Sequence, residues 1–271
     1  GSLLATIDET VTSPGRRRLG EWLARPRRDR ETIETRLDSV DALGSSALAR
    51  ERLREELGEA SDLARLASKA THGSADAGDL LRVRDALDVL PAAEAVIEDD
   101  ATLADSPLPE ILQRPDRQAA AELRAELDAA LAEEPPASLS EGGLIARGYD
   151  EELDELVAEY DEAVDWLDTL AEREKRQHGL SHVSVDRNKT DGYYIQVGKS
   201  VAGQAPEHYR EIKTLKNSKR FVTEELEERE RAVLRLEERR EELERRLLGE
   251  VRDRVAAEAE LLQDVGRALA E

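Results

Sequence analysis

The sequence predicts a mainly α fold, in which a multi-helical base and two long antiparallel helices carry a small β-rich tip. Proline and glycine punctuate the first half of the chain at intervals of roughly 12–18 residues, which is typical of short helices. Two later stretches repeat apolar residues every three or four positions without proline, and a stretch between them alternates apolar and polar residues. We therefore predict a helical base at 1–149, an outgoing helix at 150–178, a β-rich tip at 179–222 and a returning helix at 223–271.

Short helices are expected throughout the base. Asp29 is a suitable N-cap for a helix that carries Ile33, Leu37 and Val40 at helical spacing. Ser61 or Asp62 is expected to open a later helix whose leucines face inward. Pro91 is counted among the breaks between helices. A loop is expected at the Pro135-Pro136 and Gly142-Gly143 pairs.

The two long helices follow from uninterrupted apolar periodicity. The outgoing helix runs from Asp150 until Gly179 and would be about 40 Å long at 1.5 Å per residue. The returning helix begins at Thr223, has acidic residues in its first turn, and would extend for about 70 Å as one helix. Because a small sheet separates them in sequence, the helices are expected to run antiparallel and to pack as a coiled coil.

The tip is predicted to hold a β-hairpin and one further strand. Val183 and Val185 alternate with polar residues, and Tyr193, Ile195 and Val197 do the same. The connection between these runs is longer than a two-residue turn. A third strand is expected around 219–222.

Composition excludes several classes of protein. The 271 residues carry 62 Asp and Glu against 40 Lys and Arg, a formal net charge of −22. Cysteine is absent, so disulfides, thiol nucleophiles and cysteine zinc sites are excluded. The four histidines lack metal-ligand spacing, no apolar run is long enough to span a bilayer, and no signal peptide opens the chain. These features predict a cytoplasmic protein without membrane contact, and the acidic excess suggests adaptation to high internal salt.

Positive charge is concentrated in the predicted tip. Residues 173–222 hold eleven Lys and Arg against five Asp and Glu, and they include six of the seven lysines in the chain. Such an island in an acidic chain suits contact with a polyanion, because the acidic remainder would repel phosphates. The alternative is that the island balances acidic neighbours within the fold.

No motif indicates catalysis. Gly198-Lys199-Ser200 resembles part of a phosphate loop, but the required earlier glycine is missing, since Tyr193 stands at that position. The segment also does not open a helix. Paired carboxylates are too frequent in this chain to be informative. We therefore expect no catalytic residues, no metal site and no bound cofactor, and we do not expect this stretch to be an enzyme by itself.

Two clusters of basic and amide side chains suit the phosphate backbone of DNA. Lysine and arginine neutralise phosphates, and Thr, Asn and Ser donate hydrogen bonds to phosphate oxygens in any base sequence. The predicted DNA-binding residues are Lys216, Asn217, Asn188 and Lys189, followed by Lys213, Lys219 and Arg220.

The same residues carry a resemblance to the MutS family of DNA mismatch repair proteins. The segment NKTDGYYIQV at 188–197, and Tyr209 followed by KTLKNSKRF at 213–221, resemble the family's clamp. Ile7-Asp8, the TVT at 10–12 and Trp22-Leu23 resemble the opening of its core, and Gly142 to Leu156 resembles the start of its lever. The sequence departs from the family at Glu211 and Ile212, which replace basic residues and should weaken the contact with DNA.

The resemblance implies a lever and clamp region excised from a longer protein. In this family the clamp holds double-stranded, mismatched DNA, and the levers connect it to an ATPase domain that uses ATP and Mg²⁺ and forms the homodimer. A MutL-type repair partner is also implied. Neither the mismatch-reading Phe-x-Glu motif nor a phosphate loop occurs in these residues.

Three alternatives remain open at the level of sequence. The chain could be a structural coiled-coil module whose basic tip binds an acidic protein partner. It could bind a nucleotide through a degenerate phosphate loop at Gly198. It could also come from a family member that acts on recombination junctions instead of mismatches.

Overall fold

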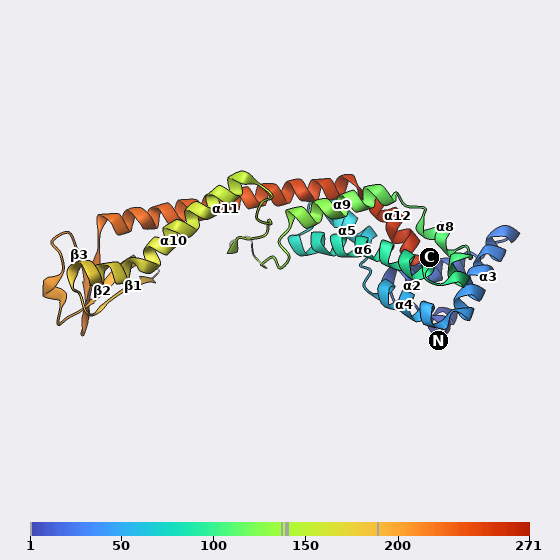
Figure 1. Ribbon diagram of the computed structural model, residues 1–271, viewed down its shortest axis with the longest axis horizontal. Helices are drawn as coiled ribbons and strands as arrows, with labels where there is room; N and C mark the ends of the chain where they lie inside the picture. Colours follow the sequence, from blue (N-terminus) through green and yellow to red (C-terminus); the bar gives the residue numbers. More distant parts are fainter. Residues whose placement is uncertain (1, 137, 139–140, 189) are drawn as a thin grey trace. The chain divides into compact units, whose positions relative to one another are not determined.

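The computed structural model describes residues 2–136, 138, 141–188 and 190–271, and it is mainly helical with one small sheet (Figure 1). The chain divides into two compact units, which are considered separately. The first comprises Gly1–Ala137, Gly143–Tyr149 and Arg246–Glu271, and the second comprises Ser138–Gly142 and Asp150–Arg245. The returning helix therefore contributes to both units, a division that the sequence pattern does not show.

The first unit is built mainly from short helices, as predicted, with the 22-residue α6 as the exception. In chain order they are α1 (Leu3–Ile7), α2 (Ser13–Ala24), α3 (Arg30–Ser45), α4 (Ala47–Gly58), α5 (Leu63–Thr71), α6 (Ala77–Glu98), α7 (Ala101–Ala104), α8 (Leu108–Leu112), α9 (Arg117–Ala130) and α12 (Ala259–Ala270). The side chain of Asp29 accepts a hydrogen bond from the N–H of Thr32, which confirms this N-cap. Of the two candidates Ser61 and Asp62, it is Asp62 that caps α5, by accepting the N–H of Arg65.

Helix α6 is the centre of this unit and packs against α4, α5 and α9. It continues through Pro91, so the predicted break at this residue is wrong. Leu87, Leu90 and Ala93 are buried around the proline. Burial of these side chains outweighs the loss of one backbone hydrogen bond in the helix.

Asp79, near the start of α6, is a buried carboxylate that ties α5 to α6. Its side chain is 2% exposed. The carboxylate accepts hydrogen bonds from Lys69 Nζ at 2.8 Å and from Arg82 Nη1 at 3.1 Å. Burial acts to raise the pKa of Asp79, but the hydrogen bonds from Lys69 and Asp76 and the two positive charges outweigh it, so the pKa is lowered.

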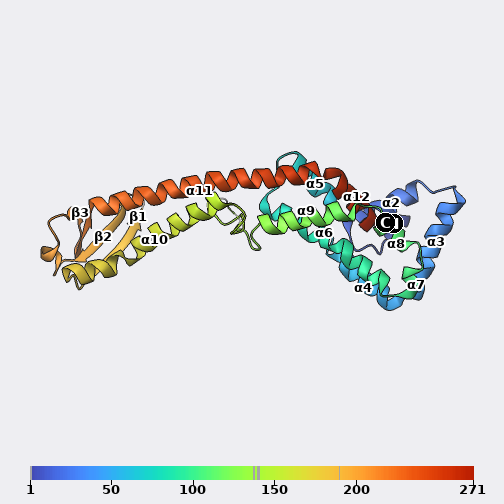
Figure 2. The same ribbon diagram turned by 45° about the horizontal axis from the view of Figure 1, so that its top comes forward.

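The second unit contains the outgoing helix α10 (Glu151–His178), most of the returning helix α11 (Glu224–Ala257) and the sheet between them. Within this unit α10 and α11 run side by side in opposite directions (Figures 1 and 2). Tyr160 of α10 donates a hydrogen bond to Glu237 of α11 at 3.2 Å, and Arg240 lies over the tyrosine ring at 4.7 Å. The antiparallel helix pair predicted from periodicity is therefore present.

The returning stretch is not a single helix, contrary to the prediction for 223–271. α11 ends at Ala257, Glu258 leaves helical geometry, and α12 begins at Ala259. Neither proline nor glycine stands at the break. Leu262 and Val265 of α12 are fully buried, and α12 packs against α5 and α2. Burial of this apolar face accounts for the change of direction, since it outweighs the few hydrogen bonds lost in one turn.

The sheet has four antiparallel strands in the order β1-β2-β4-β3: β1 (Val183–Asn188), β2 (Gly192–Gly198), β3 (Arg210–Thr214) and β4 (Ser218–Val222). The hairpin β1–β2 and strand β4 were predicted, and β3 was not. A short 3₁₀ helix, η2 (Ala202–Gln204), lies between β2 and β3. One face of the sheet joins the helices through a buried core that includes Leu167, Leu170, Ile195, Phe221 and Leu226.

Two features define how α10 ends beside the sheet. Gly179 ends α10 in the left-handed conformation at φ 65°, which glycine adopts without steric cost. Tyr209, just before β3, is buried and donates a hydrogen bond to the buried carboxylate of Glu174 in the last turns of α10. Burial first, and then this carboxylate, raises the pKa of Tyr209 far above its ordinary value, so the phenol stays protonated.

Candidate nucleic-acid interface

The register of the sheet places the two predicted DNA-binding clusters at opposite ends of it. Asn188 pairs with Gly192 at one end of β2, and Gly198 pairs with Ser218 at the other end. The six residue steps from Gly192 to Gly198 correspond to about 20 Å of strand. The cluster at Asn188 and the cluster at Lys216 are therefore separate surfaces, although both belong to the tip.

Lys216 and Asn217 form an exposed turn between β3 and β4. The turn is closed by a hydrogen bond from the N–H of Leu215 to the carbonyl oxygen of Ser218 at 2.8 Å. Both side chains are exposed, and Lys216 forms no ion pair with a residue of the described ranges. The turn therefore presents both side chains to solvent.

Lys199 lies beside this turn, although it is seventeen residues before Lys216 in the chain. Its backbone N–H donates to the carbonyl oxygen of Asn217 at 3.0 Å. Lys199 and Ser200 are exposed, and Lys199 has no carboxylate partner within the described part of the chain. We call the exposed set Lys199, Ser200, Lys216 and Asn217 the lysine edge.

Sequence reasoning counted Lys199 as part of the basic island but did not select it as a contact. Its position in the sequence could have indicated this role. A residue that follows the end of β2 lies beside the start of any strand that pairs antiparallel with β2. That signal depends on knowing that β4 pairs with β2, which the sequence does not state.

At the other end of the sheet, the side chain of Asn188 already forms hydrogen bonds within the hairpin loop. The side-chain oxygen of Asn188 accepts from the N–H groups of Thr190 at 2.9 Å and Asp191 at 2.7 Å. Its side-chain nitrogen donates to the carboxylate of Asp191 at 3.0 Å. Asn188 thus holds the hairpin loop in shape with the groups that would otherwise contact phosphate. Lys189, also predicted as a contact, lies outside the described residues.

Arg220 belongs to the same network. Its guanidinium group donates to Asp191 Oδ2 at 3.2 Å and lies over the ring of Tyr194 at 4.1 Å. The hydrogen bond from Asn188, together with Lys213 and Arg220, lowers the pKa of Asp191 against a smaller opposing effect of burial. Asp191 is therefore ionised at neutral pH and compensates the positive charge of Arg220.

Lys219 and Lys213 differ in their surroundings. Lys219 donates to Glu211 Oε2 at 2.7 Å, and this hydrogen bond is the main cause of the lowered pKa of Glu211. Lys213 is exposed and acts on Asp191 only through its charge. Of the predicted basic residues in the described tip, Lys216 and Lys213 remain the most available to an external anion.

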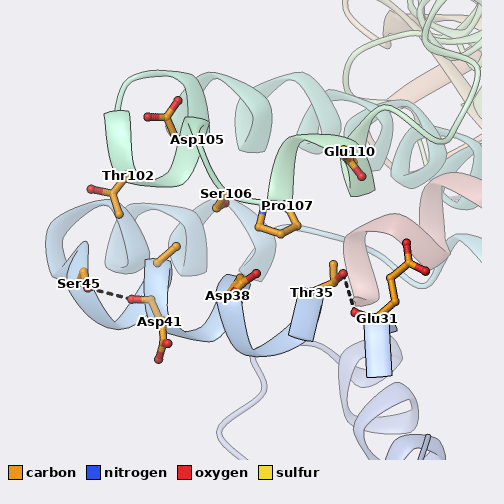
Figure 3. Close-up of a pocket in the computed structure, with 11 residues that line it drawn as sticks. Glu31, Thr35, Asp38, Asp41, Ser45, Thr102, Asp105, Ser106, Pro107 and Glu110 are labelled. Atoms are coloured by element: carbon orange, nitrogen blue, oxygen red, sulfur yellow. Dashed lines mark hydrogen bonds between the residues drawn. The ribbon is translucent and has the colours of Figure 1, made fainter. Parts of the chain in front are cut away.

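One cavity of the first unit is acidic and does not suit a phosphate. A cavity of about 700 Å³ lies between α3 and the segment of α7 and α8. Figure 3 shows its wall of acidic side chains, which includes Glu31, Asp38, Asp41, Asp105 and Glu110. A cluster of three or more residues able to hold a metal ion is not found among the described residues. None of the described helices is long and apolar enough to cross a membrane.

Comparison with known proteins identifies the family. The family described as MutS domain III matches residues 1–271. The chain belongs to the MutS family. It is 54% identical over its full length to the DNA mismatch repair protein MutS 1 of Haloarcula marismortui, and covers 29% of that protein. It is 55% identical to MutS 1 of Halobacterium salinarum and 39% identical to MutS of Thermus aquaticus, and covers 32% of each.

The match confirms the resemblance seen in the motifs, and it makes this chain a segment of a MutS-type mismatch repair protein. The chain spans about a third of the length of these relatives. Two of them come from halophilic archaea, which agrees with the salt adaptation inferred from the acidic composition.

Proposed function

We propose that the tip of this MutS segment is a clamp that holds duplex DNA by its backbone, and that the lysine edge makes the contact. The observation that carries this proposal is the difference in pairing among the basic residues of the tip. Lys199 and Lys216 are exposed without a carboxylate partner, whereas Lys219 and Arg220 are engaged by Glu211 and Asp191. An unpaired lysine gains most from a phosphate, since no existing ion pair has to be broken.

The contact is independent of base sequence. Lysine binds phosphate as a point charge, and the amide of Asn217 and the hydroxyl of Ser200 can donate to phosphate oxygens of any nucleotide. Asn188 and Arg220 support the clamp by shaping the hairpin loop, and Lys213 contributes positive charge. The clamp thus supplies affinity, and mismatch recognition belongs to another part of the whole protein.

The helix pair α10 and α11 is proposed to act as a lever. The shared core and the bond between Tyr209 and Glu174 fix the sheet to the helix ends, so the tip and its helices would move as one body. In the whole protein the lever would report DNA binding to an ATPase domain that uses ATP and Mg²⁺. Homodimerisation, a MutL-type partner and a cytoplasmic location belong to the same proposal.

Substitution of both lysines of the edge tests the clamp. In Lys199→Gln/Lys216→Gln, affinity for random-sequence duplex DNA should fall by at least about tenfold, because two phosphate contacts are lost. The slope of log K against log salt should become shallower by about one unit per lysine. Fluorescence anisotropy with a labelled duplex measures both quantities, over the KCl range in which circular dichroism shows intact helices.

The matched control is Lys175→Gln/Lys219→Gln, which removes the same charge from lysines that already pair with Glu172 and Glu211. It should change affinity less than about threefold. Equal losses of DNA affinity in the two variants would show that the overall positive charge of the chain, and not the lysine edge, determines binding. If the unaltered chain does not bind duplex, the alternative of a coiled-coil module with an acidic protein partner gains support.

A further inference from the structure

A second concentration of positive charge lies in the first unit, where α2 ends and α3 begins. Residues 14–30 contain seven arginines and only two carboxylates, in a chain whose net charge is −22. This is a higher density of positive charge than in the tip. Nothing proposed for the clamp uses it.

The seven arginines fall into two groups by their partners. Four of them pair with carboxylates at 2.8–3.5 Å: Arg16 with Asp8, Arg17 with Asp62, Arg18 with Glu21 and Glu271, and Arg30 with Glu34. The other three, Arg25, Arg27 and Arg28, lie on the segment between α2 and α3. They are exposed and form no ion pair with residues that the structure describes.

These three side chains surround a hollow. A cavity of about 960 Å³ is lined by Arg25, Arg27 and Arg28 from the connecting segment and by Arg18 and Trp22 from α2. Its two carboxylates are already engaged. Glu21 pairs with Arg18, and Asp29 accepts the N–H of Thr32 as the N-cap of α3, although the charge of Arg27 also contributes to its lowered pKa.

Arg36 of α3 adds positive charge beside this cavity. Its guanidinium group lies over the ring of Trp22 at 3.5 Å, and Arg18 lies over the same ring at 5.8 Å. The Nε atoms of Arg18 and Arg36 are buried without a hydrogen-bond partner among the described residues. Burial lowers the pKa of Arg36, the charge of Glu271 opposes this, and the charges of Arg27 and Arg18 add to the lowering. These arginines repel one another, and an anion would relieve the repulsion.

We propose that this hollow, which we call the arginine cavity, is a phosphate-binding site separate from the lysine edge. The planar guanidinium fork matches the oxygens of a phosphate and can bind two of them at once. Arg25, Arg27 and Arg28 make the contacts with phosphate. Arg18 and Arg36, which lie over the ring of Trp22, add positive potential. The cavity is large enough to take a phosphate-bearing group with its immediate surroundings.

The contacts that the proposed site offers are to phosphate. Arg36 covers one face of the indole ring of Trp22, so this face is closed to a stacked base. The phosphates could belong to a nucleic-acid strand or to a free nucleotide, and the two sources are separated by the choice of probe.

The test uses the 271-residue chain with Lys199→Gln/Lys216→Gln, which removes the lysine edge. Adding Arg25→Gln/Arg27→Gln/Arg28→Gln should weaken binding of random-sequence duplex DNA at least tenfold if the source is nucleic acid. The slope of log K against log salt should become shallower by about 2–3 units, since up to three phosphate contacts are lost. If the source is a free nucleotide, the arginine substitutions should instead abolish binding of ATP and of inorganic pyrophosphate in calorimetric titrations.

The control carries the same loss of charge at arginines that already pair with carboxylates in the first unit, Arg52→Gln/Arg124→Gln/Arg254→Gln. It should leave both kinds of binding within threefold of the parent. Circular dichroism checks that each variant is folded. The proposal is overturned if the parent binds neither duplex nor pyrophosphate, or if the arginine variant binds both as tightly as its parent. This outcome is independent of the result for the lysine edge.

Discussion

Lys216 and Lys219 are three residues apart in sequence and differ in what surrounds them. Lys216 is exposed in a turn, and Lys219 donates to Glu211 from the adjacent strand. A lysine with a carboxylate partner must give up that partner to bind a phosphate. Individual partners therefore determine which positive charges of the tip serve the proposed contact.

Asp79 gives a prediction about stability and pH. Because its pKa is lowered in the folded chain, its contribution is present above its ordinary value of 3.8 and is lost as pH falls through the lower, folded value. At pH 7, Asp79→Asn should reduce the opening free energy of α6 by about 1–2 kcal/mol, because the partly exposed Lys69 and Arg82 lose a charged hydrogen-bond acceptor. Hydrogen exchange of α6 amides measures this quantity.

The difference between Asp79→Asn and the original chain should shrink as pH falls below about 4, where the unfolded carboxyl becomes protonated. Asp85→Asn, on the same helix but with a side chain 60% exposed, is the control and should have an effect below about 0.5 kcal/mol. A pH-independent difference for Asp79→Asn would contradict the assigned role of its charge.

The sequence predicts residue roles where the cause is local. Asp29 was expected as an N-cap, and Asp62 as one of two candidates, because a cap depends only on the next three residues. The pair of Lys219 with Glu211, and the placement of Lys199 beside Asn217, depend on strand register. Alternation of side chains does not specify which strands are neighbours, so the composition of the lysine edge required the structure.

At the scale of elements, the hairpin β1–β2 depends on a glycine with a close neighbour. Gly192 has φ 69°, and a Cβ at this position would lie 2.6 Å from both side-chain oxygens of Glu230 on α11. Glu230 Oε1 accepts the N–H of Tyr193 at 3.2 Å. The start of β2 and the first turns of α11 are therefore in direct contact.

Gly192→Ala should destabilise the hairpin by about 1–2 kcal/mol, because a Cβ in the left-handed region is strained and Glu230 must also move. Hydrogen exchange of β1 and β2 amides should show the loss. Gly203→Ala is the control, since its Cβ would meet nothing within 4 Å and its φ is not in the left-handed region. Equal effects of the two substitutions would show that the close contact with Glu230 is unimportant.

Long periodic elements were predicted best. α10 was expected at 150–178 and is found at Glu151–His178, because Asp150 and Gly179 mark its ends. β3 was missed because Arg210–Thr214 contains one apolar residue and a register shift, so it lacks alternation. The break at Glu258 was missed because burial of α12, and not a local breaker, causes it.

At the scale of the whole molecule, the net charge predicts that stability depends on salt. A charge of −22 produces self-repulsion, and raising KCl from 0.1 to 1 M shortens the Debye length from about 10 to about 3 Å. The melting temperature should rise by roughly 5–10 °C over this range. Sorbitol at equal osmolality does not screen charge and should have less effect. A melting temperature independent of KCl would contradict adaptation to salt.

Site-specific cross-linking tests the central claim, contact between the lysine edge and duplex DNA, most directly. The chain has no cysteine, so Asn217→Cys and the control Glu238→Cys, on α11 of the same unit, each accept a single photoreactive aryl azide. With random-sequence duplex, illumination should cross-link DNA to the label at position 217 and leave the label at position 238 at background. Cross-linking at position 217 no stronger than at position 238 would contradict the account.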